Sequence, residues 1–312
     1  MRVVFLGTPE FAVPSLEAVA ARHEVLAVFT QPDRPKGRGN QLAESPVKGA
    51  ARELGIAIYQ PERVRRPESM ELLRGLAMDL MVVVGYGQII PQAIIDLPPH
   101  GILNVHASLL PRYRGAAPVQ WAIANGESET GVTIMQIDAG LDTGDMLGKA
   151  RMPIGVEETA PELSARLAPM GAELLCETIA QIEAGTVHRE KQNAGEATLA
   201  PILKKEDGLI HWHLMTASQI DHRLRGFTPW PGAYTGFRGQ QLSIARARPA
   251  SIDSSLAAGR LHVERRRLFA GCRDRTVLEL LEVQPAGKKR VTSKAFLNGY
   301  KVTETESLGE LA

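Results

Sequence analysis

The sequence contains only two cysteines, Cys176 and Cys272, and they lie far apart. This spacing predicts neither a disulfide framework nor a cysteine-based metal site. Long hydrophobic runs are missing as well, since no stretch approaches the roughly 18 apolar residues of a membrane-spanning helix. The apolar run at the N-terminus ends at Gly7 and is too short for a signal peptide. We therefore expect a cytoplasmic protein with no membrane partner.

Two phosphate-binding motifs are also missing. The run GTPEFA lacks the later glycines of G-x-G-x-x-G, so we interpret Gly7 as part of a tight turn from strand to helix. No Walker A pattern occurs. No serine or cysteine has the surroundings of a nucleophile elbow, which favours direct group transfer over a covalent enzyme intermediate.

The net charge is close to zero for the whole chain but not for its two parts. The 312 residues carry a formal net charge of only +1, with 44% hydrophobic and 23% charged residues. At about 150 residues per domain this length predicts two globular domains. Residues 204–312 hold 18 Lys/Arg and 11 Asp/Glu, a net of +7, whereas the preceding part has a net of −6. A basic last third suggests a nucleic acid or another polyanion, and a merely solvated surface is the alternative.

The first part of the chain alternates apolar runs with helical patterns. Continuous apolar strands separated by helices are typical of a parallel sheet that is covered on both faces. We therefore predict that residues 1–188 form an α/β domain with a doubly wound, mostly parallel sheet. The expected strands are 2–6, 25–30, 56–59, 80–84, 101–105 and 132–137, and the expected helices are 11–21, 67–77, 118–124 and 158–184.

The pattern changes after this domain. Residues 189–203 are polar and contain glycine and proline, so we predict a linker there. Beyond it, short runs at 242–247, 260–263 and 277–283 are separated by turn residues, with one helix candidate at 217–224. Such short strands predict that residues 204–312 form a smaller, OB-like β-barrel domain.

A long polar segment at 31–45 comes directly after the strand expected at 25–30. It carries Arg34, Lys36 and Arg38 among glycines and a proline. Long loops in compact domains are often functional, and cations on such a loop suit contacts to phosphates. A solvated surface loop is the equal alternative.

The densest chemical signal begins at Asn104. Asn104 and His106 stand two residues apart at the end of an expected strand, so their side chains point to the same face. Ligands of open α/β sheets bind beyond the carboxyl ends of the strands. A single histidine is usually structural, but an Asn–His pair at this place offers two hydrogen-bond donors to a developing oxyanion.

A second polar stretch comes after the strand at 132–137, with acids at Asp138, Asp142 and Asp145 among glycines. The spacing of an EF-hand calcium loop and its terminal glutamate are absent. A tight turn capped by aspartate is one interpretation. If one carboxylate reaches His106, it would hold the imidazole tautomer and favour the protonated ring.

The motif NVHASLLPRYRGAAPVQWAI, followed by TGVTIMQIDAGLDTGD, resembles the 10-formyltetrahydrofolate-dependent formyltransferases. The similarity extends over most of the chain and includes FLGTPEFAVPSL, FTQPDRPKGRG, VVVGYGQIIP, FTPWPGAY and LEVQPAGKK. The resemblance implies a Rossmann-like formyltransferase domain. The basic loop and the C-terminal segments are similar to those of family members that act on a tRNA.

By this resemblance, Asn104, His106 and Asp142 match the catalytic trio of the family. Its folate-binding segment matches Ser108, Leu109, Leu110 and Pro111, and Arg38 matches a basic residue used on the tRNA acceptor end, with Arg34 and Lys36 beside it. The basic face of the barrel would lie along the acceptor arm. Candidate contacts there are Arg246, Arg248, 265–267 and 288–290.

The implied reaction transfers a formyl group from 10-formyltetrahydrofolate to the α-amino group of methionine on initiator tRNA, and it supplies formylmethionine for translation initiation. We expect a monomer. We also expect that no metal is needed, because the formyl donor is already activated. Three alternatives stay open: a formyltransferase for a small amine, a non-catalytic module that binds RNA, and a folate hydrolase that releases formate.

Overall fold

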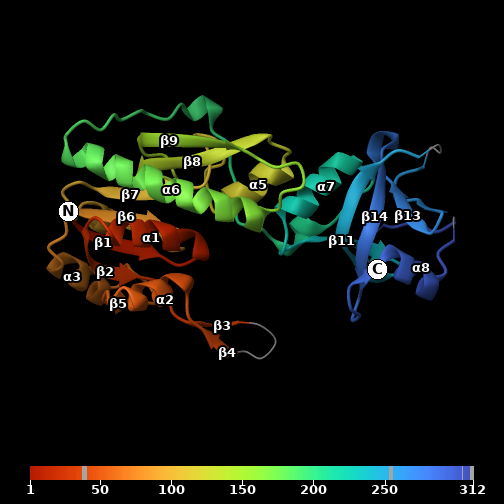
Figure 1. Ribbon diagram of the computed structural model, residues 1–312, viewed down its shortest axis with the longest axis horizontal. Helices are drawn as coiled ribbons and strands as arrows, with labels where there is room; N and C mark the ends of the chain where they lie inside the picture. Colours follow the sequence, from red (N-terminus) through yellow and green to blue (C-terminus); the bar gives the residue numbers. More distant parts are fainter. Residues whose placement is uncertain (37–40, 253–255, 304, 310–312) are drawn as a thin grey trace. The chain divides into compact units, whose positions relative to one another are not determined.

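The computed structural model describes residues 1–36, 41–252, 256–303 and 305–309, and the chain divides into two compact units (Figure 1). Unit 1 comprises Met1–Pro118, Glu129–Pro153 and Leu163–Pro201. Unit 2 comprises Val119–Ser128, Ile154–Glu162 and Ile202–Ala312.

Unit 1 is built on a seven-stranded sheet in the order β5-β2-β1-β6-β7-β8-β9. The strands from β5 to β7 are parallel, whereas β8 is antiparallel to both of its neighbours. The sheet is therefore mostly parallel, as predicted, although the sequence did not predict the reversed direction of β8. The strands are β1 Arg2–Gly7, β2 Glu24–Phe29, β5 Ile58–Tyr59, β6 Leu80–Val84, β7 Ile102–His106, β8 Glu129–Gln136 and β9 Met146–Pro153.

Helices cover both faces of this sheet, as expected for a doubly wound fold. Val4 of β1 shares one buried cluster with Leu73 of α3 and Ile94 of α4. On the other face, Gly171 of α6 lies so close to β7 that an added Cβ would come within 2.8 Å of Val105 Cγ1. The helices of this layer structure are α1 Val13–Ala20, α2 Pro46–Glu53, α3 Pro67–Gly75, α4 Gln92–Ile95 and α6 Ala160–Glu183.

The segment 31–45 corrects one expectation, because it is not a plain loop. Residues Arg34–Lys36 (β3) and Gln41–Ala43 (β4) pair as an antiparallel hairpin in which Arg34 lies opposite Ala43. The residues between the two strands lie outside the described part of the chain. The sequence pattern missed the hairpin because its strands are short and polar and contain a proline, which is tolerated only in edge strands.

Unit 2 contains an antiparallel sheet in the order β10-β11-β14-β13-β12, with β15 paired to β14. Gly309 exchanges two backbone hydrogen bonds with Gly236 of β10, at 2.8 and 3.0 Å, and Leu308 N–H donates to Gly259 O beside β12 at 2.7 Å. The C-terminal segment thus bridges the two edges and closes a small antiparallel barrel. The elements are α5 Pro118–Ala124, α7 Ala217–Gly226, β10 Ala233–Phe237, β11 Gln240–Ala250, β12 Leu261–Glu264, β13 Arg267–Gly271, β14 Val277–Pro285, β15 Val291–Thr292 and α8 Ser293–Tyr300.

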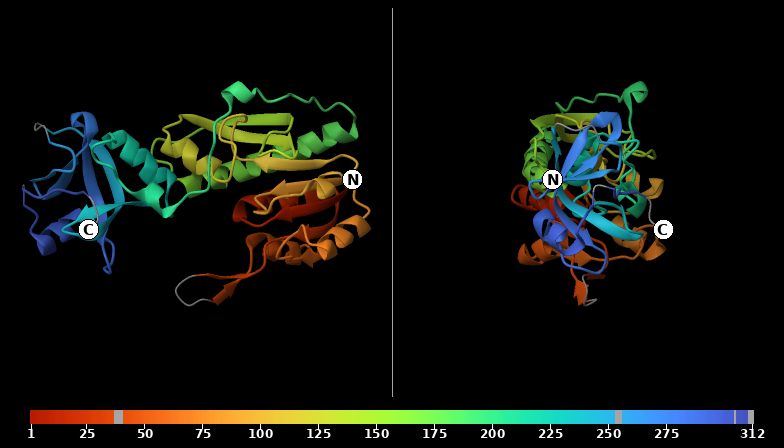
Figure 2. Two further views of the ribbon diagram at one scale, coloured as in Figure 1. Left: turned by 180° about the vertical axis from the view of Figure 1, so that it is seen from behind. Right: turned by 90° about the vertical axis from the view of Figure 1, so that its right-hand side faces the viewer.

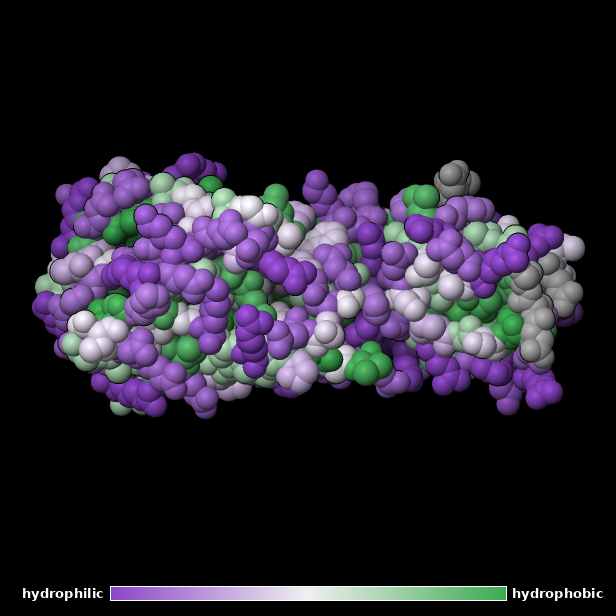
Figure 3. All heavy atoms as spheres, turned by 90° about the horizontal axis from the view of Figure 1, so that it is seen from above, coloured by the Kyte–Doolittle hydropathy of each residue, from purple (hydrophilic) through white to green (hydrophobic). Residues whose placement is uncertain are grey.

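With 23% charged residues, the chain is expected to have a mostly polar surface. The face of the molecule in Figure 3 is mostly hydrophilic, and its hydrophobic residues form small separate patches. Within the described residues, no helix is both long and apolar enough to cross a membrane.

Candidate functional site

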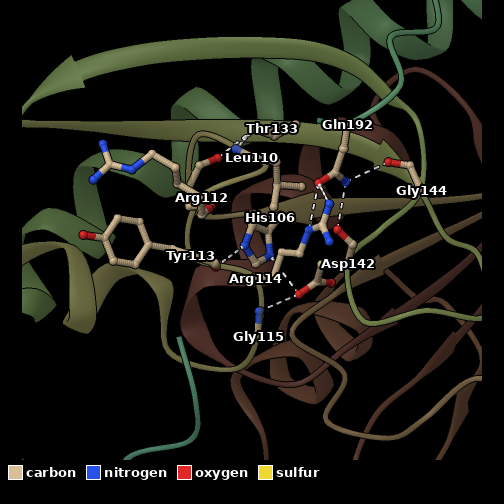
Figure 4. A network of polar contacts seen from close by, with 11 residues as sticks. His106, Leu110, Arg112, Tyr113, Arg114, Gly115, Thr133, Asp142, Gly144 and Gln192 are labelled. Carbon is tan, nitrogen blue, oxygen red and sulfur yellow. Dashed lines mark hydrogen bonds and ion pairs between the residues drawn. The ribbon is translucent and has the colours of Figure 1, made fainter. Parts of the chain in front are cut away.

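The site begins at the carboxyl end of β7, where His106 is the last residue of the strand. Asn104 and His106 alternate with Leu103 and Val105, so they share the face of the sheet on which Ile102 packs against α3 and α4. The His106 side chain is only 5% exposed. An imidazole buried to this degree requires polar surroundings for its ring nitrogens: Nε2 has a hydrogen-bond partner and Nδ1 faces a carboxylate (Figure 4).

His106 Nε2 lies 2.9 Å from the carbonyl oxygen of Tyr113. A carbonyl only accepts hydrogen bonds, so this contact places a hydrogen on Nε2. The other nitrogen, Nδ1, lies 3.7 Å from Asp142 Oδ2. This distance is too long for a hydrogen bond but short enough for strong Coulomb attraction between a carboxylate and a protonated ring.

Asp142 is held independently of His106. Its Oδ2 accepts a hydrogen bond from Gly115 N–H at 2.8 Å, and its side chain is 18% exposed. Its φ of 50° lies in the left-handed region, which residues with a Cβ adopt rarely, although aspartate does so more often than most. The neighbouring Asp138 has another role, because its Oδ1 accepts from Gly140 N–H and from the Thr143 hydroxyl and so caps the turn.

Asn104 is half-buried on β7. Among the described residues, its side-chain amide has no hydrogen-bond partner, while its backbone belongs to the ladders with β6 and β8. An amide group without a protein partner at the carboxyl end of a strand can donate its N–H groups to a bound ligand.

The segment after β7 turns most of its side chains inward. Ser108 is fully buried, and its hydroxyl donates to Arg112 O at 2.7 Å. The Leu110 side chain is also buried, and Leu110 N–H donates to Thr133 Oγ1 at 3.1 Å. Because Pro111 is buried too and Leu109 is half-buried, only backbone groups and Leu109 can be offered to a ligand by this segment.

Sequence reasoning missed several residues that hold this site together. Gln192 bonds both to Arg114 and to the carbonyls of Asp142 and Gly144 (Figure 4). It lies in the polar stretch that we predicted to be a linker, where no periodicity distinguishes a functional side chain. Thr133 was missed because its role depends on pairing between β7 and β8, where it lies opposite His106.

The basic residues of the predicted tRNA-binding loop are only partly described. Arg34 is exposed on β3. Together with Arg63, Arg65, Gln88 and other residues, it lines a pocket of about 290 Å³. Lys36 ends β3. Arg38 lies outside the described residues. The pocket beside Arg34 is lined by none of the residues of the Asn104, His106 and Asp142 trio.

Many arginines of the barrel are paired with acids within their own unit. Glu279 is 4% exposed, and it accepts hydrogen bonds from Arg248 at 2.8 Å and from Arg267 at 2.7 and 2.8 Å. The bond from Arg267 is the main cause that lowers the pKa of Glu279. Glu282 forms ion pairs with Arg246 and Arg290. These four arginines therefore already have acidic partners, although the region as a whole keeps its positive net charge.

In the described part of the chain, no group of three or more His, Cys, Asp or Glu side chains is arranged to hold a metal ion. Burial raises the pKa of the Cys272 thiol to about 12 and also raises the pKa of Cys176, so both thiols stay protonated near neutral pH.

Comparison with known proteins identifies both units. Residues 1–179 match the family model "Formyl transferase", and residues 202–301 match "Formyl transferase, C-terminal domain". The methionyl-tRNA formyltransferase of Solibacter usitatus is 60% identical over 99% of both chains, and that of Koribacter versatilis is 56% identical over 100% of both. The fold is similar to that of a sugar 3N-formyltransferase crystallised with dTDP and 5-N-formyl-THF. That structure has a TM-score of 0.67 and 19% identity over 93% of this chain and 99% of its own.

Proposed function

Because the chain belongs to the formyl transferase family, we propose that it transfers a formyl group from 10-formyltetrahydrofolate to the α-amino group of methionine on initiator tRNA. The product is N-formylmethionyl-tRNA, the substrate of translation initiation. The observation that carries the proposal is the similarity to methionyl-tRNA formyltransferases along 99% of the chain, including both units. The buried His106 with its partner Asp142, and the Asn104 amide to which no described residue bonds, support it independently.

In the proposed reaction, the methionine amine attacks the formyl carbon and a C–N bond forms. The formyl oxygen becomes an oxyanion in a tetrahedral intermediate. The bond from the formyl carbon to N10 of the folate then breaks, and the proton lost by the amine ends on N10. The chain therefore has to bind the two substrates, stabilise the oxyanion and move one proton.

The side chains fit these tasks. Asn104 donates an amide N–H to the oxyanion, since no described residue forms a hydrogen bond with that amide. His106 Nε2 is committed to Tyr113 O at 2.9 Å, so Nδ1 is the ring atom available to the substrate. Asp142, at 3.7 Å from Nδ1, stabilises the protonated ring by its charge. Losing one donor to an oxyanion typically lowers the rate by about 10²–10³-fold.

We also propose which residues bind the two substrates. Ser108, Leu109, Leu110 and Pro111 form the proposed folate segment, and the side-chain burial of three of them favours contacts through the backbone and Leu109. Arg34, Lys36 and Arg38 are proposed to contact tRNA phosphates. Residues 1–188 and 204–312 are the proposed catalytic and tRNA-binding domains. We propose that the enzyme acts as a monomer in the cytoplasm, where aminoacylated tRNA is made.

The test is to incubate the protein with 10-formyltetrahydrofolate and methionine-charged initiator tRNA and to assay for formylmethionine. Uncharged tRNA and a nucleotide-linked amino sugar serve as control acceptors. His106→Ala should lower turnover, and Arg38→Ala should chiefly raise the KM for tRNA. Formylation of the amino sugar but not of the charged tRNA would refute the proposed substrate, and unchanged turnover of His106→Ala would refute the proposed site.

A further inference from the structure

The side chain of Gln192 uses its whole hydrogen-bonding capacity beside the site (Figure 4). Its Oε1 accepts from Arg114 Nε at 3.0 Å and from Arg114 Nη2 at 2.7 Å. Its Nε2 donates to the carbonyl oxygens of Asp142 and Gly144, both at 2.8 Å. A carboxamide has two N–H donors and two acceptor lone pairs, so all four positions are occupied.

This arrangement fixes which way round the amide lies. A guanidinium can only donate and a backbone carbonyl can only accept, so oxygen must face Arg114 and nitrogen must face the two carbonyls. Glutamate could serve Arg114 but could not donate to the carbonyls. The amide of glutamine therefore suits both loops, whereas the carboxylate of glutamate suits only one.

The two loops that Gln192 joins carry the two partners of His106. The first loop contains Tyr113, whose carbonyl accepts from His106 Nε2, and Gly115, whose N–H donates to Asp142. The second loop contains Asp142 itself. A shift of either loop would change the surroundings of one ring nitrogen.

The backbone around Gln192 is anchored at both ends of its segment. Glu190 and Met146 of β9 exchange two backbone hydrogen bonds, at 2.8 and 2.9 Å. Farther along, Thr198 Oγ1 accepts from Tyr113 N–H at 2.8 Å. In Figures 1 and 2 the chain after α6 passes along the β9 edge of the sheet. The predicted linker is therefore attached to unit 1 by hydrogen bonds, next to the site.

We propose that Gln192 is a positioning residue for formyl transfer, which holds the Asp142 carboxylate and the Tyr113 carbonyl where they orient the His106 ring. The inference rests on the proposed function, because it assumes that His106 acts in the reaction. Gln192 acts directly on the backbone of Asp142, because it donates to the carbonyl of that residue, whose φ of 50° is uncommon for a residue other than glycine.

The experiment compares Gln192→Met and Gln192→Glu with wild type in the formylation assay. Methionine matches the size of glutamine but removes all four bonds, whereas glutamate keeps the acceptor for Arg114 and removes both donors. For both variants we expect kcat to fall about 10–100-fold, because losing a group that orients a reacting residue, or misplacing a reacting group by about 1 Å, has effects of this size. The KM values for folate and tRNA should stay within about threefold, since Gln192 contacts neither substrate in this scheme.

The matched control is Asn193→Ala. Asn193 lies next to Gln192 in the same segment, but its side chain bonds, among the described residues, only to Gly195 and Glu196. This variant should keep the wild-type kcat. A Gln192→Met enzyme with a kcat equal to that of Asn193→Ala would overturn the inference.

Two further measurements separate positioning from general damage. In a His106→Asn background, Gln192→Met should lower kcat no further, because the effect passes through the His106 ring; multiplied losses would overturn the inference. The ¹⁵N signals of the His106 imidazole should shift in Gln192→Met and Gln192→Glu but not in Asn193→Ala. Unshifted signals would contradict positioning even if activity fell.

These readouts distinguish the two proposals. If the wild-type protein formylates no charged tRNA, the proposed function fails, while the imidazole signals still report whether Gln192 orients His106. If wild type is active, His106→Asn is inactive and both Gln192 variants are fully active, the proposed function stands and the positioning role is refuted.

Discussion

Replacing Asp142 by asparagine tests the electrostatic part of the site. The substitution keeps the size and shape of the side chain, and the amide oxygen can still accept the Gly115 N–H that Asp142 Oδ2 accepts at 2.8 Å. The change removes the negative charge 3.7 Å from His106 Nδ1. We therefore expect the fold to persist while the stabilisation of a protonated His106 disappears.

The expected magnitude depends on that distance. Two unit charges about 4 Å apart attract by about 4 kcal/mol at an effective dielectric constant near 20. The Asp142 side chain is 18% exposed, so water screens part of this attraction. A loss of about 3–4 kcal/mol of transition-state stabilisation corresponds to a fall in kcat of about 10²–10³-fold.

The assay is steady-state formylation of charged initiator tRNA, with thermal unfolding measured on the same samples. Asp138→Asn is the matched control, because it makes the same chemical change in the same loop at a carboxylate that caps the turn through Gly140 and Thr143. We expect the control to keep its kcat and Asp142→Asn to keep its melting temperature within about 2 °C. A kcat of Asp142→Asn within about threefold of wild type would refute the electrostatic role, since it corresponds to less than about 1 kcal/mol.

Three further predictions concern the two units separately. Glu279→Gln should destabilise unit 2 by about 1–3 kcal/mol in urea unfolding, because it weakens charged hydrogen bonds from two arginines. The folded pKa of Glu279 is lowered, so its contribution to the free energy of unfolding is present above the unfolded pKa of about 4.3 and is lost as the pH falls through the folded pKa. The difference in stability between wild type and Glu279→Gln should therefore disappear at low pH, and a difference that does not change with pH would contradict this. Tyr86→Phe should raise the free energy of unfolding by about 1 kcal/mol, because the 1% exposed Tyr86 hydroxyl has no hydrogen-bond partner among the described residues; a loss of stability would show that the hydroxyl is satisfied. Arg34→Ala should weaken tRNA binding and reduce the slope of log K against log salt by about 1 while kcat is kept, and an unchanged slope would exclude a phosphate contact by Arg34.

Much of the fold was predictable because its signals are local. The run LMVVV at 80–84 is a strand buried on both faces, and the helix expected at 118–124 has those bounds in the structure. The direction of β8 was not predictable in this way. Its strand pattern is the same in either direction, and only its pairing with β7 and β9 shows that it is antiparallel.

The candidate site likewise contains residues that the sequence could indicate and residues that it could not. Asn104 and His106 could be proposed from the sequence because two residues on one strand share a face by the geometry of the backbone. Gln192 could not, because it meets Asp142 across 50 residues of chain and its own segment has no periodic pattern. Likewise, the charge count suggested a basic barrel, but the pairing of Arg248 and Arg267 with Glu279 depends on three neighbouring strands.

The sequence by itself thus determined the class of the fold and the presence of two units, and it supplied the candidate residues of the site. It could do so because hydrophobic periodicity, turn residues and short motifs act over a few residues. The tertiary structure alone decided which groups meet: Asp142 with His106, Gln192 with both loops, and the C-terminal segment with the two edges of the barrel. Contacts between distant segments depend on how strands pair and pack, and no local pattern records that.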